Sequence, residues 1–221
     1  MAKLGRLYIP DERDDEFLMQ SVPPLMTAKA AKKRKKKVPL RMAWSVPTVL
    51  NQLAKPHCVA FAWKHYLMAA PISQGEFLNE AFLYELAQKY DCWPGENYDG
   101  TSVRAGAKVL RNMGFVESYR WGKSAADVKK WVMTRGPVVL GTRWYVNMSR
   151  LKNGYARPTG RQMGGHAYLC FAYWANRNAF RCLNSWGPKW GNNGRFWITY
   201  NHLDKLIKQQ GEACVAIERD A

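Results

Sequence analysis

The pattern of the sequence changes at Gly136-Pro137, and this change constrains the fold more than any other feature. Before it, apolar residues recur at helical spacing, whereas after it short β-rich runs are separated by Gly, Asn and Pro. Helices are predicted over residues 58–70, 76–90, 101–113 and 124–134. Strands are predicted over 138–142, 167–174, 179–184, 195–199 and 214–218. Helices followed by strands predict an α+β protein, with a helical lobe over 43–135 facing a sheet or barrel lobe over 136–221.

The first 42 residues differ from this body and are interpreted as an N-terminal arm. Lys and Arg total 34 against 17 Asp and Glu, a net charge of +17, and the densest run is the basic strap, residues 28–37. Its charged residues include Lys32, Lys33, Arg34, Lys35, Lys36 and Lys37. Because like charges repel, we expect a solvated segment that serves either as a plain linker or as a binding element for an acidic partner.

The sequence predicts neither a membrane anchor nor a metal or cofactor site. Acidic residues at 11–16 stand where a signal peptide needs an apolar core, and no apolar run approaches the roughly 20 residues of a spanning helix. The five cysteines and four histidines show no zinc-ligand spacing. We therefore expect a cytoplasmic or virion-associated protein with no membrane partner, whose cysteines other than Cys58 (Cys92, Cys170, Cys182 and Cys214) are core thiols.

Three residues are candidates for nucleophilic chemistry. Cys58 begins a predicted buried helix, and a helix N-terminus stabilises a thiolate. A thiolate nucleophile needs a base, and that base needs an orienting partner. His166 follows Gly164-Gly165 at the start of one predicted strand, and Asn184 ends the next. Two neighbouring antiparallel strands would place imidazole and carboxamide side by side, whereas His57 and His65 are expected to be exposed or on a helix surface.

These residues lie within sequences that resemble the papain-like cysteine peptidases. The resemblance covers residues 44–218, nearly the whole body, and its form with two glycines before His166 is similar to the bacterial and phage branches. It is carried by Asn51-Gln52-Leu-Ala-Lys-Pro-His-Cys58-Val-Ala-Phe, Gly136-Pro137-Val138, Gly165-His166-Ala167 and Asn184-Ser185-Trp186-Gly187-Pro-Lys-Trp190-Gly191-Asn-Asn-Gly194. It implies a papain-like fold of two lobes with the active-site cleft between them.

The resemblance also implies a role for each matching residue. Cys58 would be the nucleophile, His166 the base and acid, and Asn184 the residue that orients the imidazole. Gln52 would donate to the oxyanion hole, a contribution typically of about 3 kcal/mol. Trp186 would shield the bond between His166 and Asn184 from water. The substrate backbone would lie along Gly100, Thr101 and Gly165.

The sequence also departs from the family pattern. Lys55 stands where a disulfide cysteine is usual, and Val59 replaces the aromatic residue that commonly follows the nucleophile. Thr101 stands where a second glycine is common, which would narrow the cleft. Because the region before the body is short, we expect control by the basic strap, by a partner or by restricted access to the cleft.

Two functions are compatible with these observations. In the first, the chain is a thiol endopeptidase that cleaves protein or peptide substrates, and transpeptidation or peptidoglycan amide hydrolysis stays open because the same groups serve it. In the alternative, a papain scaffold has a structural or binding role, for example in a phage particle. Its strap and basic body would then bind nucleic acid or another acidic partner without sequence preference.

Overall fold

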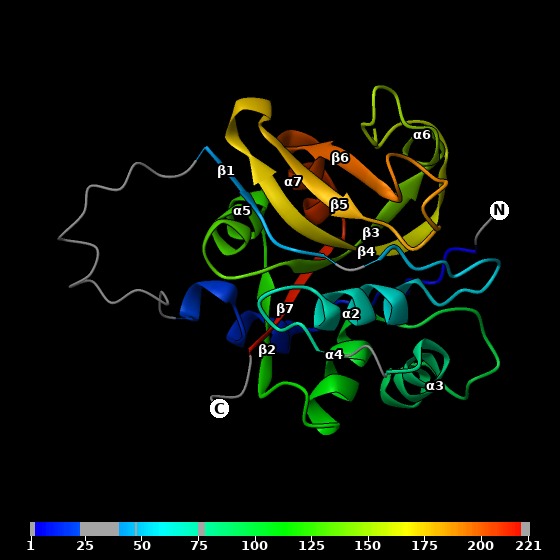
Figure 1. Ribbon diagram of the computed structural model, residues 1–221. Coiled ribbons are helices and arrows are strands. Elements are labelled where there is room, and N and C mark those ends of the chain that lie inside the picture. The colour runs from blue at the N-terminus through cyan, green and yellow to red at the C-terminus, as the bar shows by residue number, and fades with distance from the viewer. Residues whose placement is uncertain (1–2, 23–39, 47, 75–77, 218–221) are drawn as a thin grey trace, which may run out of the picture.

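The computed structural model describes residues 3–22, 40–46, 48–74 and 78–217. Helices α2 (Cys58–Met68), α3 (Glu80–Tyr90) and α4 (Val103–Asn112) lie together on one side of the molecule (Figure 1). The 3-10 helices η1 (Glu12–Glu16) and η2 (Met19–Ser21) precede them. Helices α5 (Ala125–Thr134), α6 (Val146–Ser149) and α7 (Tyr200–Lys208), with the 3-10 helix η3 (Ala175–Arg177), complete the set within the described ranges.

One antiparallel sheet runs through the molecule in the order β2-β7-β3-β4-β5-β6, with β1 paired to β4. Its strands are β1 (Arg41–Ala43), β2 (Ser118–Gly122), β3 (Val138–Tyr145), β4 (Gln162–Trp174), β5 (Ala179–Leu183), β6 (Arg195–Thr199) and β7 (Glu212–Ile217). Every pairing between these strands is antiparallel. The predicted α+β class is confirmed by this arrangement.

Side chains that alternate along the sheet build two hydrophobic cores. Val139 of β3 and Leu169 of β4 pack with the apolar residues of α2, α3 and α4. Their neighbours Leu140 and Tyr168 pack on the other face with α5 and α7. Successive strand residues point to opposite faces, so the same strands serve both cores. The boundary between the two lobes is therefore a shared sheet rather than a linker.

Side-chain caps begin helices α3, α4 and α5. Asn79 accepts hydrogen bonds from two amides of α3, and Ser102 Oγ accepts one from Ala105 N–H at 3.1 Å. Ser124 Oγ accepts from Asp127 N–H at 3.2 Å, which confirms the predicted capping pattern of α5. Asn79, Ser102 and Ser124 thus satisfy amides that a helix start leaves without partners.

Four elements break the predicted division into helices before Gly136-Pro137 and strands after it. Strands β1 and β2 lie before this boundary and pair with β4 and β7, whereas helices α6 and α7 lie after it. The sequence of β2, Ser-Tyr-Arg-Trp-Gly, has neither a clear alternation nor a turn signal on both sides. Only pairing with β7 makes it a strand.

One prediction falls on residues outside the described ranges. The basic strap, residues 28–37, lies outside the described ranges, so its role stays a prediction. Within those ranges, no helix combines the length and apolar character that crossing a bilayer requires. Nor do His, Cys, Asp and Glu gather there in groups of three or more that could ligate a metal ion.

Tyr66 ties α2 to the end of β7. Its hydroxyl donates to Ala216 O and accepts from Ala216 N–H, both at 3.0 Å, beyond the point where β3 pairs with β7. Replacing Tyr66 by Phe leaves two buried backbone groups without this partner. We expect the free energy of unfolding to fall by about 1–3 kcal/mol. Urea denaturation checks this, with Tyr90→Phe on an exposed ring as the control that should change little.

Candidate active site

Cys58 is the first residue of α2 and is fully buried. Burial raises the pKa of its thiol above the ordinary value, because a charged sulfur loses its hydration. Backbone N–H groups of Ala167, Gly5 and Val59 act in the opposite direction by donating toward the sulfur. Two of these groups come from outside α2: Ala167 belongs to β4, and Gly5 belongs to the start of the chain.

His166 and Asn184 meet as the predicted strand pairing requires. Strands β4 and β5 are neighbours, and the imidazole Nε2 lies 2.8 Å from Asn184 Oδ1. That oxygen also accepts from Ser185 N–H at 2.8 Å, so Nε2 is the donor and Nδ1 carries the lone pair in the neutral ring. Nδ1 is buried and has no hydrogen-bond partner among the described residues. It is therefore free to take a proton.

Aromatic rings enclose the imidazole. Trp186 lies with its ring centroid 4.9 Å from that of His166, and Trp144 approaches edge-on at 4.8 Å. Burial lowers the pKa of His166 to about 4, although the hydrogen bond with Asn184 acts to raise it. Sequence reasoning found Trp186 but missed Trp144, the second-last residue of β3, which pairs with Gly164. Only the register of β3 against β4 reveals that contact.

The side chain of Gln52 is held by the loop that follows Asn184. Ser185 Oγ donates to Gln52 Oε1 at 2.6 Å, and Gln52 N–H donates to Ser185 O at 2.8 Å. The amide oxygen is thereby occupied, which leaves Nε2 as the group that faces other partners. It donates to Lys55 O at 2.7 Å and to Lys3 O at 2.9 Å. Gln52 therefore presents a donor to a backbone carbonyl from the start of the chain.

The N-terminal segment, residues 3–22, begins by crossing between the two halves of the molecule (Figure 1). On one side, Leu7 N–H donates to Thr101 O and Thr101 N–H donates to Gly5 O, both at 2.9 Å. On the other, Arg6 N–H donates to Gly165 O at 3.1 Å. A Cβ atom on Gly165 would lie 2.2 Å from Arg6 O, so only glycine admits this approach.

The predicted substrate-binding positions therefore flank the chain's own backbone. Gly100 also lies against the N-terminal segment, since a Cβ atom on Gly100 would be 2.5 Å from Gly5 O. Residues 5–7 pair with Thr101 in parallel, and they place an N–H group, that of Gly5, toward the Cys58 sulfur. A peptide ready for attack would instead present its carbonyl carbon.

The rest of the N-terminal segment is anchored along the helical half. Arg104 of α4 forms ion pairs with both Asp11 and Asp14. Gln20 Nε2 donates to Asp127 Oδ1 at 2.9 Å, and Met19 is buried in the core under β2 and α5. This geometry agrees with one of the expected means of control, restricted access to the cleft. The residues that would restrict access precede the basic strap.

Two expectations about individual side chains are wrong. His65 is buried rather than on the helix surface; its Nε2 accepts from Leu50 N–H at 3.2 Å, two residues before Gln52. Cys92 is exposed rather than in the core, since it lies in the loop after α3. Cys170, Cys182 and Cys214 are buried free thiols, as predicted.

Comparison with known proteins adds a family assignment to this geometry. The profile described as "Papain family cysteine protease" matches residues 69–215, about two-thirds of the chain. The chain belongs to the papain family of cysteine proteases. The matched region contains His166 and Asn184 but begins after Gln52 and Cys58. The roles of Gln52 and Cys58 are therefore inferred from the residues around them in the sequence and not from this match.

Individual papain-family relatives agree with the assignment. Cathepsin B-like cysteine proteinase 3 of Ostertagia ostertagi is 25% identical over 153 residues, 60% of this chain and 87% of the relative. Cathepsin B-like cysteine proteinase 4 of Caenorhabditis elegans is 32% identical over 85 residues, 37% of this chain, and the match spans only 25% of that protein. The fold of xylellain, a cysteine protease from Xylella fastidiosa, superposes with a TM-score of 0.74 at 22% identity, covering 99% and 98% of the two chains.

The burial of His166 predicts a difference between closed and open forms of the cleft. With the N-terminal segment in place, we expect the imidazole to titrate near a pKa of about 4. Opening exposes the ring to water, so its pKa should rise toward about 6.5. Because the pKa of His166 is lower in the closed form, the closed form is favoured most above pH 6.5. This preference is lost as the pH falls from about 6.5 toward 4, since the open form binds a proton more readily. NMR titration of His166 in the full chain and in Gly5→Ala tests this; identical titration curves would contradict it.

Proposed function

We propose that the chain hydrolyses peptide bonds through an acyl-enzyme on Cys58. The observation that carries the proposal is the 2.8 Å contact between His166 Nε2 and Asn184 Oδ1, buried beside Trp186. This contact fixes the imidazole tautomer that leaves Nδ1 as a base. Cys58 at the start of α2 supplies the thiol, whose thiolate form a helix N-terminus stabilises.

In the first half-reaction, His166 Nδ1 takes the proton of the Cys58 thiol and the thiolate attacks the substrate carbonyl carbon. The oxygen of the resulting tetrahedral intermediate becomes negative and accepts hydrogen bonds from Gln52 Nε2 and Cys58 N–H. His166 then gives its proton to the leaving amine, the C–N bond breaks, and a thioester remains. In the second half-reaction, water gives a proton to His166 and attacks the thioester. The C–S bond breaks, the acid leaves and the thiol is restored.

This cycle requires that the N-terminal segment leave the cleft. In the closed form, Lys3 O occupies a donor of Gln52, and Gly5 N–H faces the sulfur. Burial raises the pKa of Cys58 and lowers that of His166, so both groups are held neutral. The thiolate–imidazolium pair that attacks substrate is thus disfavoured until water enters. We infer that the closed form is a resting state.

Variants of the reacting groups test the chemistry. Cys58→Ala should abolish hydrolysis of a fluorogenic peptide while the circular dichroism spectrum is unchanged. Gln52→Ala removes one oxyanion donor, so kcat should fall by about 100- to 1,000-fold. Both variants are measured with Gly5→Ala present, so that the cleft is open. Gln74→Ala, at an exposed position, is the matched control that should keep full activity. Hydrolysis that persists in Cys58→Ala would refute the proposed nucleophile.

A single methyl group tests whether the N-terminal segment blocks the cleft. A Cβ atom on Gly5 would lie 1.8 Å from Pro56 O, and Pro56 cannot move without moving the start of α2. Overpacking of this kind costs about 1–3 kcal/mol, which raises the open population by about 5- to 150-fold. Gly5→Ala should therefore react that much faster with an epoxysuccinyl inhibitor, followed by intact-protein mass spectrometry.

The matched control for this test is Glu12→Ala, which alters an exposed side chain of the same segment. Its reaction rate should equal that of the unaltered chain. Equal rates in all three proteins would mean that residues 3–7 do not limit access to Cys58. Loss of the adduct in Cys58→Ala identifies the modified residue.

A further inference from the structure

The second half of the chain contains a long stretch without acidic residues. Residues 128–203 include twelve Lys and Arg but neither Asp nor Glu. Strands β3, β4, β5 and β6 lie within this stretch. Because like charges repel, cations that gather on a folded surface need anionic partners. The stretch supplies none of its own, so a partner must come from another part of the chain or from a ligand.

Some of these cations share one face of the sheet. Phe180 and Cys182 of β5 pack in the core that contains α5 and α7. Arg181 lies between them in the strand, so its side chain points to the opposite face. Arg195 and Trp197 alternate in the same way with core residues of β6. Because the register pairs Arg181 with Trp197, these side chains lie together.

Two indole rings hold guanidinium groups on this face. The Cζ atoms of Arg177 and Arg181 lie 5.2 and 5.1 Å from the ring centroid of Trp197. Those of Arg177 and Arg41 lie 5.4 and 5.7 Å from the ring centroid of Trp174. A guanidinium that stacks on a ring keeps its N–H edge available for an anion. We call the two rings and four arginines the basic face: Trp174, Trp197, Arg41, Arg177, Arg181 and Arg195.

The basic face has no carboxylate to balance its charge. None of the ion pairs between described residues involves an arginine of this face. Burial lowers the pKa of Arg181, and the charges of Arg195 and Arg177 lower it further. These three cations therefore repel one another, and an anion placed between them would relieve the repulsion.

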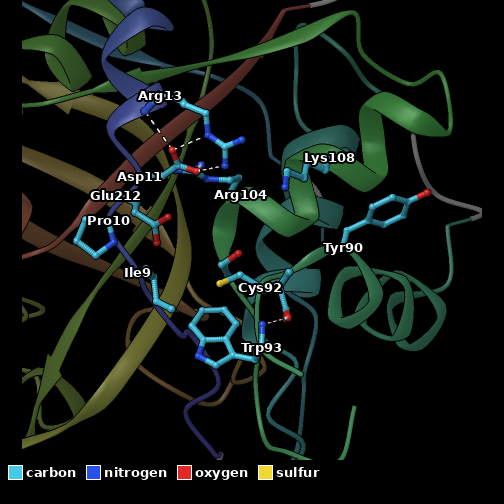
Figure 2. Close-up of a pocket in the computed structure, with 12 residues that line it drawn as sticks. Ile9, Pro10, Asp11, Arg13, Tyr90, Cys92, Trp93, Arg104, Lys108 and Glu212 are labelled. Carbon is cyan, nitrogen blue, oxygen red and sulfur yellow. Dashed lines mark hydrogen bonds and ion pairs between the residues drawn. The ribbon is translucent and has the colours of Figure 1, made fainter. Parts of the chain in front are cut away.

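Cations near the N-terminal segment, in contrast, are balanced. Arg6 Nε donates to Glu212 Oε2 at 2.8 Å. Figure 2 shows Arg13 and Arg104 beside Asp11, with which both form ion pairs. The cavity of about 120 Å³ in this view thus holds carboxylates next to its cations. An anionic ligand would meet repulsion there that it would not meet at the basic face.

A groove of about 840 Å³ adjoins the basic face. Arg177 and Trp197 belong to both, and Lys189 adds an exposed cation to the groove. The half-buried ring of Trp190 lies in its wall. Side-chain amides add further hydrogen-bond donors: Asn153, Asn192 and Asn193. No Asp or Glu is among the described residues that line the groove, so it too favours an anion.

The basic face and groove offer side chains rather than a free strand edge. Strand β6 is the last in the sheet order, but its outer edge is covered. Trp197 N–H donates to Gly154 O, and Ala156 N–H donates to Trp197 O, both at 2.8 Å. An extended acidic peptide therefore cannot add there as a further strand. Nucleic acid needs no strand edge, because cations bind its phosphates and aromatic rings stack on its bases.

The basic strap, residues 28–37, connects to the basic face through residues 38–40. Strand β1 begins at Arg41, which pairs with Trp174 of β4. Leu40 O accepts from Ala175 N–H at 2.7 Å, which holds the chain at this point. The densest run of positive charge in the sequence thus leads directly into the basic face.

We propose that the basic face and its groove bind single-stranded nucleic acid. Phosphates contact the guanidinium groups and Lys189, and bases stack on the half-buried rings of Trp174 and Trp190. Such contacts read no base edges, so binding is independent of base sequence. The site goes beyond the proposed peptidase function, and its occupation would hold the peptidase near proteins that are themselves bound to nucleic acid.

The experiment measures binding of a fluorescent oligothymidylate of about 20 nucleotides by anisotropy. The full chain is titrated at several salt concentrations between about 50 and 200 mM. Arg177→Gln combined with Lys189→Gln removes two exposed cations of the groove. The Kd should rise about tenfold at the lowest salt concentration. The slope of log K against log salt should become shallower by about 1.4, since each phosphate contact on a single strand contributes about 0.7.

Two matched variants accompany this measurement. Lys89→Gln combined with Arg111→Gln removes two exposed cations from α3 and α4, and it should leave the slope unchanged. Arg177→Lys combined with Lys189→Arg keeps both charges and should bind like the unaltered chain. The basic strap is present in every protein, so its own contribution cancels in each comparison.

Each outcome decides the proposal. Equal losses in the groove variant and in the helix variant would mean that net charge alone drives binding, which overturns the proposal. Full binding by the groove variant, or no binding by the unaltered chain, overturns it as well. Polyglutamate and vesicles of phosphatidylserine serve as competitors at equal charge concentration. Displacement of the oligonucleotide by either would assign the face to acidic protein or to lipid, whereas displacement only by unlabelled oligonucleotide supports the proposal.

Discussion

The backbone hydrogen bonds of residues 5–7 join the two halves of the molecule across the site. They reach Thr101 at the start of the helical wall and Gly165 at the start of β4, at 2.9 and 3.1 Å. Residues 5–7 lie beside Cys58, and Trp144 and Trp186 enclose His166, so both reacting groups are fully buried. Burial raises the pKa of Cys58 and lowers that of His166. The same segment brings Arg6 to Glu212, so the buried ion pair also holds residues 5–7 in place.

Much of the site could be predicted because the positions of its residues follow from local sequence patterns, such as helix starts and the pairing of adjacent strands. Cys58 starts a helix that is apolar nearly all round, and β4 and β5 are neighbours in sequence and in the sheet. Antiparallel pairing of adjacent strands is the common arrangement, so the contact of His166 with Asn184 follows from their places along the chain. The N-terminal cap of α5 at Ser124 is local in the same sense.

Contacts between distant parts of the chain could not be predicted in this way. Arg6 and Glu212 are 206 residues apart, and nothing in the spacing of either residue points to the other. Trp144 reaches His166 only through the register of β3 against β4. His65 resembles a surface residue in its sequence, yet it accepts a hydrogen bond from Leu50 and lies in the core. Such contacts depend on the final packing, and no local pattern records them.

Residue-resolved amide hydrogen exchange of the full chain tests the central claim, that residues 5–7 lie hydrogen-bonded in the cleft. The amides of Arg6, Leu7 and Thr101 donate there, and exchange requires that these bonds open. We predict that these three amides exchange far more slowly than those of an unstructured peptide, and that Gly5→Ala speeds them together. Exchange at the rate of an unstructured peptide in the unaltered chain would contradict the claim, because it would show that residues 5–7 are not held by hydrogen bonds in the cleft.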